Sequence, residues 1–143
     1  MKKRMLYLIL PIITLILEIL PYGAVCNFAR PATDGSIGQF RELYSYFDLI
    51  PFGYANFAPF ITAIITCIIL AILVLYCIAN QQRLAVAARN ILCVCTVFSL
   101  GPLVLGVRFF SVVGGLITAT LITELLFICF TSKTPEGKSM ESK

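Results

Sequence analysis

Histidine and tryptophan are both missing from this chain of 143 residues, and only seven residues are acidic. Without histidine there is no imidazole for general-base catalysis, for a Ser-His or Cys-His nucleophilic pair, or for metal binding. The sequence also lacks the glycine patterns that bind phosphate in nucleotide sites. These absences argue against an enzyme, and we expect no catalytic residue, no metal site and no cofactor.

The cysteines do not replace the missing ligands, because no Cys-x-x-Cys motif is present. Cys93 and Cys95 are two positions apart, so on a helix they point about 200° away from each other and do not chelate one ion together. Cys26 alone lies outside the apolar runs. The other five are expected to behave as small hydrophobic residues.

Charge is scarce as well, since 13% of residues are charged and 59% are hydrophobic, with a mean hydropathy of +0.96. A soluble domain carries about 25% charged residues, so this chain lacks the polar surface that water requires. The net charge of +4 is concentrated near the ends of the chain and in one short connection. No basic stripe with interleaved aromatic residues is present, which excludes a nucleic-acid partner.

Four apolar runs dominate the sequence, at about residues 5–20, 60–78, 87–105 and 109–130. A membrane-spanning helix needs about 20 predominantly apolar residues, and each run approaches or meets that length. None alternates in the way of a barrel strand. The sequence therefore predicts an all-α membrane protein, a four-helix transmembrane bundle forming a single domain over residues 1–143, in contact with the lipid bilayer.

Orientation follows from the lysine and arginine residues, which are enriched in cytoplasmic segments. Residues 1–4, 79–90 and 131–143 hold eight of the eleven basic residues. We therefore expect a multi-pass protein of the cell membrane with a cytoplasmic N-terminus and a cytoplasmic tail at 131–143. An alternative is that the N-terminal apolar run is a signal peptide cleaved at Ala24-Val25-Cys26, which leaves three helices, although Glu18 interrupts its apolar region.

The segment 21–59 is then external, and it is rich in aromatic residues, which favour the membrane interface. Ser36 and Gln39 have the spacing of a helix-capping box. The next apolar side chains fall on one helical face, namely Ile37, Phe40, Leu43, Tyr44 and Phe47. The pattern predicts a short external amphipathic helix between the first two spans, acting as an anchor on the membrane surface or as a lid over an external site.

Two carboxylates lie inside apolar runs, Glu18 near the outer end of the first and Glu124 deeper in the fourth. Ionisable residues at such depth face protein or water and are functional candidates. Pairing between helices is the alternative. Arg108 shares the expected depth of Glu18, and Arg89 lies within side-chain reach of Glu124, so either pair is expected to join two helices without moving a substrate.

Small residues recur every four positions in the fourth run, at Ser111, Gly115 and Ala119. Such a face lets two helix backbones approach closely. It predicts helix packing within the bundle, or contact with a homodimer partner or another membrane protein.

Three functions are compatible with these features. The sequence favours the first, association with other membrane proteins, and the second, its alternative, is a small transporter or channel-like oligomer that uses Glu124 or Glu18. The second requires polar residues along one continuous interior face, for which the sequence offers Thr62, Thr66, Thr96, Ser99, Thr118, Thr120 and Thr123. A membrane enzyme acting on lipid is the least favoured, because the catalytic residues are missing.

Overall fold

A computed structural model describes residues 2–31, 37–54 and 56–132. These residues form four long helices, α1 (Lys2–Ile19), α3 (Ala58–Ala79), α4 (Gln82–Ser99) and α6 (Val112–Ser132). Shorter elements are α2 (Leu49–Gly53), α5 (Gly101–Leu105) and the 3-10 turn η1 (Val107–Phe109). A hairpin of β1 (Ala24–Pro31) and β2 (Ile37–Tyr44) follows α1. The described chain is mostly helical, as the sequence predicts, and the hairpin is its departure from the expected all-α fold.

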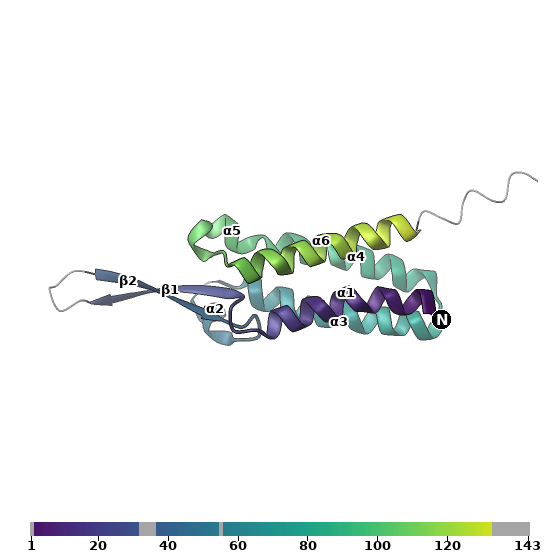
Figure 1. Cartoon of the computed structure of the whole chain (residues 1–143), viewed down its shortest axis with the longest axis horizontal. Coiled ribbons are helices and arrows are strands. Elements are labelled where there is room, and N and C mark those ends of the chain that lie inside the picture. The colour runs from purple at the N-terminus through teal and green to yellow at the C-terminus, as the bar shows by residue number, and fades with distance from the viewer. Residues whose placement is uncertain (1, 32–36, 55, 133–143) are drawn as a thin grey trace, which may run out of the picture.

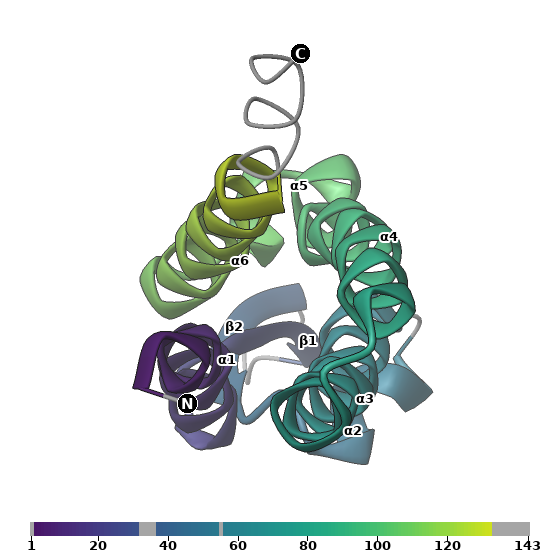
Figure 2. The same ribbon diagram turned by 90° about the vertical axis from the view of Figure 1, so that its right-hand side faces the viewer.

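The long helices lie side by side in the order α1, α3, α4, α6, and each packs against its two neighbours (Figures 1 and 2). Neighbouring helices run in opposite directions. The hairpin projects beyond one end of the bundle, which we call the hairpin end. The opposite end, called the terminal end, carries the start of α1 and the end of α6.

Within the described ranges, three helices are long and apolar enough to cross a membrane, at Ala58–Ala79, Gln82–Leu105 and Val112–Thr131, and Leu6–Ile19 is a shorter apolar helix. Their boundaries follow local chemistry. Pro59 occupies the first turn of α3, where its missing N–H costs nothing. Asn80 ends that helix in the left-handed conformation at φ 54°, which asparagine tolerates better than most residues. The third span therefore begins at Gln82, five residues before the expected start.

The prediction of an amphipathic helix between the first two spans is wrong, because residues 37–44 form a strand that pairs antiparallel with residues 24–31. Phe40 lies directly opposite Phe28, and the ring of Phe28 also contacts Tyr44 and Tyr54. Cross-strand aromatic pairs stabilise a hairpin, and they depend on a partner strand that helical periodicity ignores. Ser36, the proposed helix cap, lies outside the described residues.

The base of the hairpin closes its end of the bundle. Tyr46 is 1% exposed, and its ring lies against Gly23 and Gly114. Backbone and side-chain bonds fasten this region to α1 and α6, because the Tyr46 N–H donates to the Glu18 carbonyl and the Ser111 hydroxyl donates to the Gly23 carbonyl. The Asn56 amide adds a bond to the Val25 carbonyl at 3.2 Å.

Candidate functional site: a polar interior between the long helices

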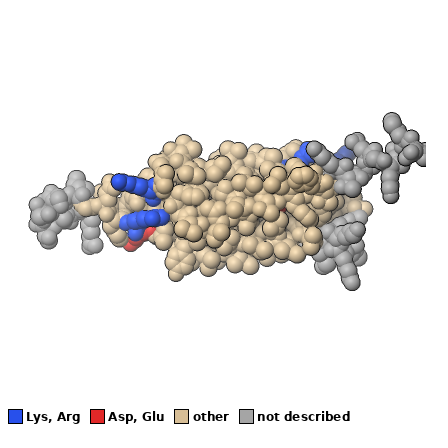
Figure 3. Space-filling view, turned by 45° about the horizontal axis from the view of Figure 1, so that its top comes forward, with Lys and Arg blue, Asp and Glu red and all other residues tan. Residues whose placement is uncertain are grey.

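Polarity is inverted relative to a protein that folds in water. Large apolar side chains are exposed along the outside of every long helix, for example Ile16, Ile78, Val97 and Phe130. The flank seen in Figure 3 is almost entirely free of charged side chains, which gather near its two ends. Polar side chains are buried between the helices instead. We call this set the polar interior: Thr14, Glu18, Thr62, Thr66, Cys95, Ser99, Thr118 and Glu124.

Glu18 is fully buried near the C-terminal end of α1. Its Oε1 accepts a hydrogen bond of 2.8 Å from the Thr66 hydroxyl on α3. Its Oε2 is buried without a hydrogen-bond partner in the described part of the chain. One oxygen of this carboxylate is thus bonded to a neighbouring helix, and the other has no hydrogen bond within the described residues.

Glu124, on α6, is 1% exposed. Both of its carboxylate oxygens lack a hydrogen-bond partner within the described ranges. Buried polar groups are nearly always hydrogen-bonded, and burying an ionised carboxylate without a counter-charge is very costly. Glu124 in this position therefore requires a proton, a cation or water as its companion.

A hydroxyl pair joins α1 and α6 between the two glutamates, where Thr14 donates to Thr120 at 2.9 Å. Glu18 lies four residues from Thr14 toward the hairpin end, and Glu124 lies four residues from Thr120 toward the terminal end, about 6 Å along the axis in each case. Side chains lean toward the N-terminus of their helix. Because α1 and α6 run in opposite directions, both carboxylates lean toward the level of the threonine pair.

Neither predicted ion pair is formed. Arg108 is exposed and donates to the Gln39 side chain at 3.5 Å, because its segment forms the 3-10 turn beside the hairpin rather than the start of a spanning helix. Glu18 is bound to Thr66 instead. Arg89 is only half-buried on α4, beside the inward stripe of that helix, and Glu124 receives no hydrogen bond from it.

The small-residue face on α6 does not form one packing surface. Ser111 is buried, Gly115 lies under the ring of Phe110, and Ala119 is exposed. A four-residue repeat turns about 40° around the helix at each step, so the stripe runs from the interior to the outside. Gly114 makes the close approach, since a Cβ there would lie 3.2 Å from the Tyr46 hydroxyl.

The sequence identified part of the polar interior. Thr62, Thr66, Ser99 and Thr118 are buried, Thr96 and Thr120 are half-buried, and Thr123 is exposed on the outside. Sequence reasoning missed the two residues that complete the cluster, Thr14 and Cys95. The available signal for Thr14 was its position one helical turn before Glu18.

Aromatic residues close both ends of the polar interior. Tyr46 fills the hairpin end. At the terminal end the ring of Tyr7 meets Tyr76 at 5.8 Å and Phe127 at 5.2 Å between ring centres, both edge to face. The carboxylates lie between these two groups of aromatic side chains along the bundle.

Two tyrosines and one cysteine at the hairpin and its base, Tyr44, Tyr46 and Cys26, have raised pKa values and stay protonated at neutral pH. The Tyr44 hydroxyl donates to the Glu42 carboxylate, and this bond raises the pKa of Tyr44 to about 12. Burial raises the pKa of Tyr46 and of the Cys26 thiol. Cys26 is a free cysteine that is buried, so it lacks the accessible, electropositive setting of a reactive thiol.

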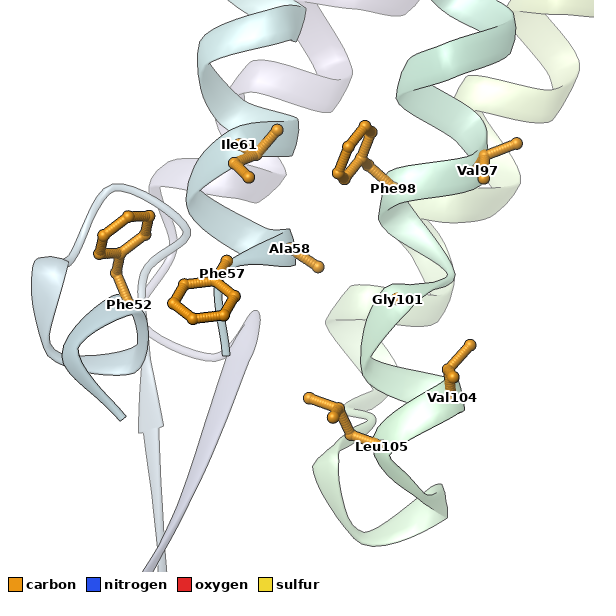
Figure 4. A pocket seen from close by; sticks show the side chains of 9 residues that line it. All are labelled: Phe52, Phe57, Ala58, Ile61, Val97, Phe98, Gly101, Val104 and Leu105. Atoms are coloured by element: carbon orange, nitrogen blue, oxygen red, sulfur yellow. The ribbon is translucent and has the colours of Figure 1, made fainter. Parts of the chain in front are cut away.

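An apolar groove of about 580 Å³ opens on the flank between α3 and α4, near the hairpin end (Figure 4). Phe52 and Phe57 lie on one side of it, and Phe98 and Leu105 point toward them from the other side. The described residues that line the groove are all apolar. The residues described contain no group of three His, Cys, Asp or Glu side chains that could hold a metal ion.

Comparison with protein-family models, with curated proteins and with solved structures gives no match to this chain, so the polar interior is the basis on which its function can be argued.

Proposed function

We propose that this chain is a cell-membrane protein that crosses the bilayer four times, with both termini in the cytoplasm and the hairpin outside. The inverted polarity supports this proposal. The 18 residues of α1 extend about 27 Å, close to the hydrocarbon thickness of about 30 Å, so α1 is long enough for the fourth crossing. The excess of basic residues at the terminal end supports the orientation.

Topology is tested with reporter fusions. A reporter after Lys143 is expected to read cytoplasmic, and one inserted in the 32–36 connection is expected to read external. A C-terminal reporter that is active only outside would overturn the orientation, and it would favour the alternative of three helices behind a cleaved leader.

We further propose that the protein transfers protons or small inorganic cations through its polar interior, using Glu124 and Glu18. The observation that carries this proposal is Glu124, which is 1% exposed and whose two oxygens are both without a partner in the described chain. An intramembrane carboxylate of this kind is a typical proton or cation site. Structural pairing with Arg89, the alternative reading of the sequence, has no supporting hydrogen bond.

The size of the ligand follows from the packing around the carboxylates. Direct hydrogen bonds join α1 to α6 through Thr14 and α1 to α3 through Glu18. Several of the remaining interior residues are small, among them Ala63, Ala88 and Ser99. Helices held together by direct hydrogen bonds, with small side chains between them, suit a proton, water or a single inorganic ion and disfavour a bulky organic cation.

The test uses purified protein in liposomes that contain a pH-sensitive dye, with a potassium gradient and valinomycin to set the membrane potential. Wild-type protein is expected to accelerate proton entry, and Glu124→Gln to reduce the rate to that of protein-free liposomes. Thr123→Val is the matched control, because Thr123 is the adjacent residue but is exposed on the outside of α6. Proton entry equal to that of protein-free liposomes, together with sodium and potassium fluxes at the protein-free rate in liposomes without valinomycin, would overturn the proposal.

Association with another membrane protein or a second copy remains a proposal drawn from the sequence. Its main motivation, the small-residue face, is divided between the interior and the surface of α6. Purification in mild detergent followed by mass spectrometry tests it, since a partner at fixed stoichiometry is expected. We do not propose an enzymatic activity.

A further inference from the structure

The Thr66 hydroxyl lies between two acceptors. Its Oγ1 is 2.8 Å from Glu18 Oε1 and 3.0 Å from the carbonyl oxygen of Thr62, one turn earlier on α3. A hydroxyl has one proton to donate and two lone pairs that accept. Thr66 therefore donates to only one of these oxygens at a time, and the choice depends on the charge of Glu18.

Two arrangements of protons fit the same heavy-atom positions. When Glu18 is ionised, Thr66 donates to its carboxylate. When Oε1 carries a proton, that O–H donates to Thr66 Oγ1, and Thr66 donates to the Thr62 carbonyl instead. The carboxylate gains one proton on Oε1 and no other covalent bond changes. Both protonation states thus have a complete set of hydrogen bonds at this oxygen, and neither requires the helices to move.

Cys95 extends the network to α4. Its sulfur is 3.7 Å from Thr66 Oγ1 and 3.7 Å from the Thr62 carbonyl oxygen. The thiol is a weak donor and acceptor, so it can donate to the Thr62 carbonyl when Thr66 donates to Glu18. Three helices consequently share one set of hydrogen bonds around Glu18.

The surroundings of Glu18 contain no opposing charge in the described chain. The titratable groups that act on it or respond to it are Tyr46 at the hairpin base, Cys67 on α3, Cys95 on α4 and Glu124 on α6. None of these side chains carries a positive charge in any protonation state. A negative charge on Glu18 is therefore stabilised by hydrogen bonds alone, and the Thr66 hydroxyl donates the bond that the carboxylate receives.

We propose that Thr66 is a positioning residue that reverses its hydrogen bond with Glu18, so that Glu18 binds and releases a proton while the helices stay in place. Glu18 is then the proton-loading site of the pathway proposed above, on which this inference rests. Glu124 has no such partner in the described chain, so its companion is the transferred proton or ion, or water.

The test follows the carboxylic acid C=O band by infrared difference spectroscopy, acid minus neutral, on protein in lipid. Wild type is expected to show a band that Glu18→Gln removes. Thr66→Ser keeps the hydroxyl and is expected to leave the band in place. Thr66→Val keeps the shape but removes the acceptor for the acid proton, so the band is expected to shift to higher wavenumber. Thr123→Val is the matched control and is expected to match wild type.

A wild-type spectrum without a pH-dependent acid band would overturn the inference, and so would equal band positions in Thr66→Ser and Thr66→Val. If Glu18→Gln does not fold, the contrast between the serine and valine variants still assigns the band to the group that bonds residue 66. Failure of the inference differs from failure of proton transfer. A band that behaves as expected in a protein without flux supports the hydrogen-bond reversal and refutes transfer.

Discussion

Replacing Gly23 by alanine is expected to destabilise the closure at the hairpin end. A Cβ at this position would lie 2.7 Å from Cδ1 and 2.9 Å from Cε1 of the Tyr46 ring. Carbon atoms pack best at about 3.5–4.0 Å, so the overlap is at least about 0.6 Å. The Tyr46 ring is buried, at 1% exposed, so it has little room to move away from the added methyl group. Overpacking of this kind costs about 1–3 kcal/mol.

The assay is equilibrium unfolding in detergent by titration with dodecyl sulfate. Gly53→Ala is the matched control, because a Cβ there would meet nothing within 4 Å, and surface changes stay within about 0.5 kcal/mol. Tyr46→Ala alone is expected to cost about 3–5 kcal/mol. Adding Gly23→Ala to it is expected to cost almost nothing more, since the ring that causes the overlap is gone. Additive costs, or a Gly23→Ala variant as stable as the control, would refute this account of the closure.

Three further outcomes are expected. Thr14→Val and Thr120→Val are each expected to lower the free energy of unfolding by about 0.6 kcal/mol, up to about 1.7 kcal/mol. The double variant is expected to lose no more than one of them, because both remove the same interhelical hydrogen bond, and additive losses would contradict this. The changes in unfolding free energy caused by Arg89→Gln and Glu124→Gln are expected to add within about 0.5 kcal/mol, because no hydrogen bond joins the two side chains. A larger deviation from additivity, measured by the same dodecyl sulfate titration, would show that the two side chains interact. The pKa of Tyr44 is raised from its usual 10.0 to about 12 by its hydrogen bond to Glu42. This bond therefore stabilises the hairpin fully below about pH 10, and the stabilisation is lost as the pH rises through about 12. In a spectrophotometric titration, Glu42→Gln should make one tyrosine ionise at lower pH, and unchanged curves would count against this bond.

Hydropathy was a reliable guide to the helices and a poor guide to the segment between the first two. Residues 58–79 and 112–132 correspond to the expected runs within about three residues, because apolar length is a property of the local sequence. The spacing of Ile37, Phe40 and Tyr44 fitted a helix, yet these residues belong to β2. Strand pairing with residues 24–31 overrode that local pattern.

The sequence likewise identified some residues of the candidate site and not their contacts. Glu18 and Glu124 are conspicuous in the sequence, because a charged residue in an apolar run is costly wherever the helix packs. Their partners are not conspicuous. Arg108 and Arg89 matched them in expected depth, but depth alone does not fix the direction in which a side chain points around the helix.

The sequence by itself determined that the chain is mostly helical and apolar and that two carboxylates lie inside its apolar runs, because each of these follows from composition and run length. Only the tertiary structure decided that Thr66 binds Glu18, that Thr14 joins Thr120 between the glutamates, and that Glu124 has no partner in the described chain. The physical reason is that contacts between helices depend on the rotation and offset of each helix about its axis. Those quantities are set by the packing of all four helices together, and no single run of sequence contains them.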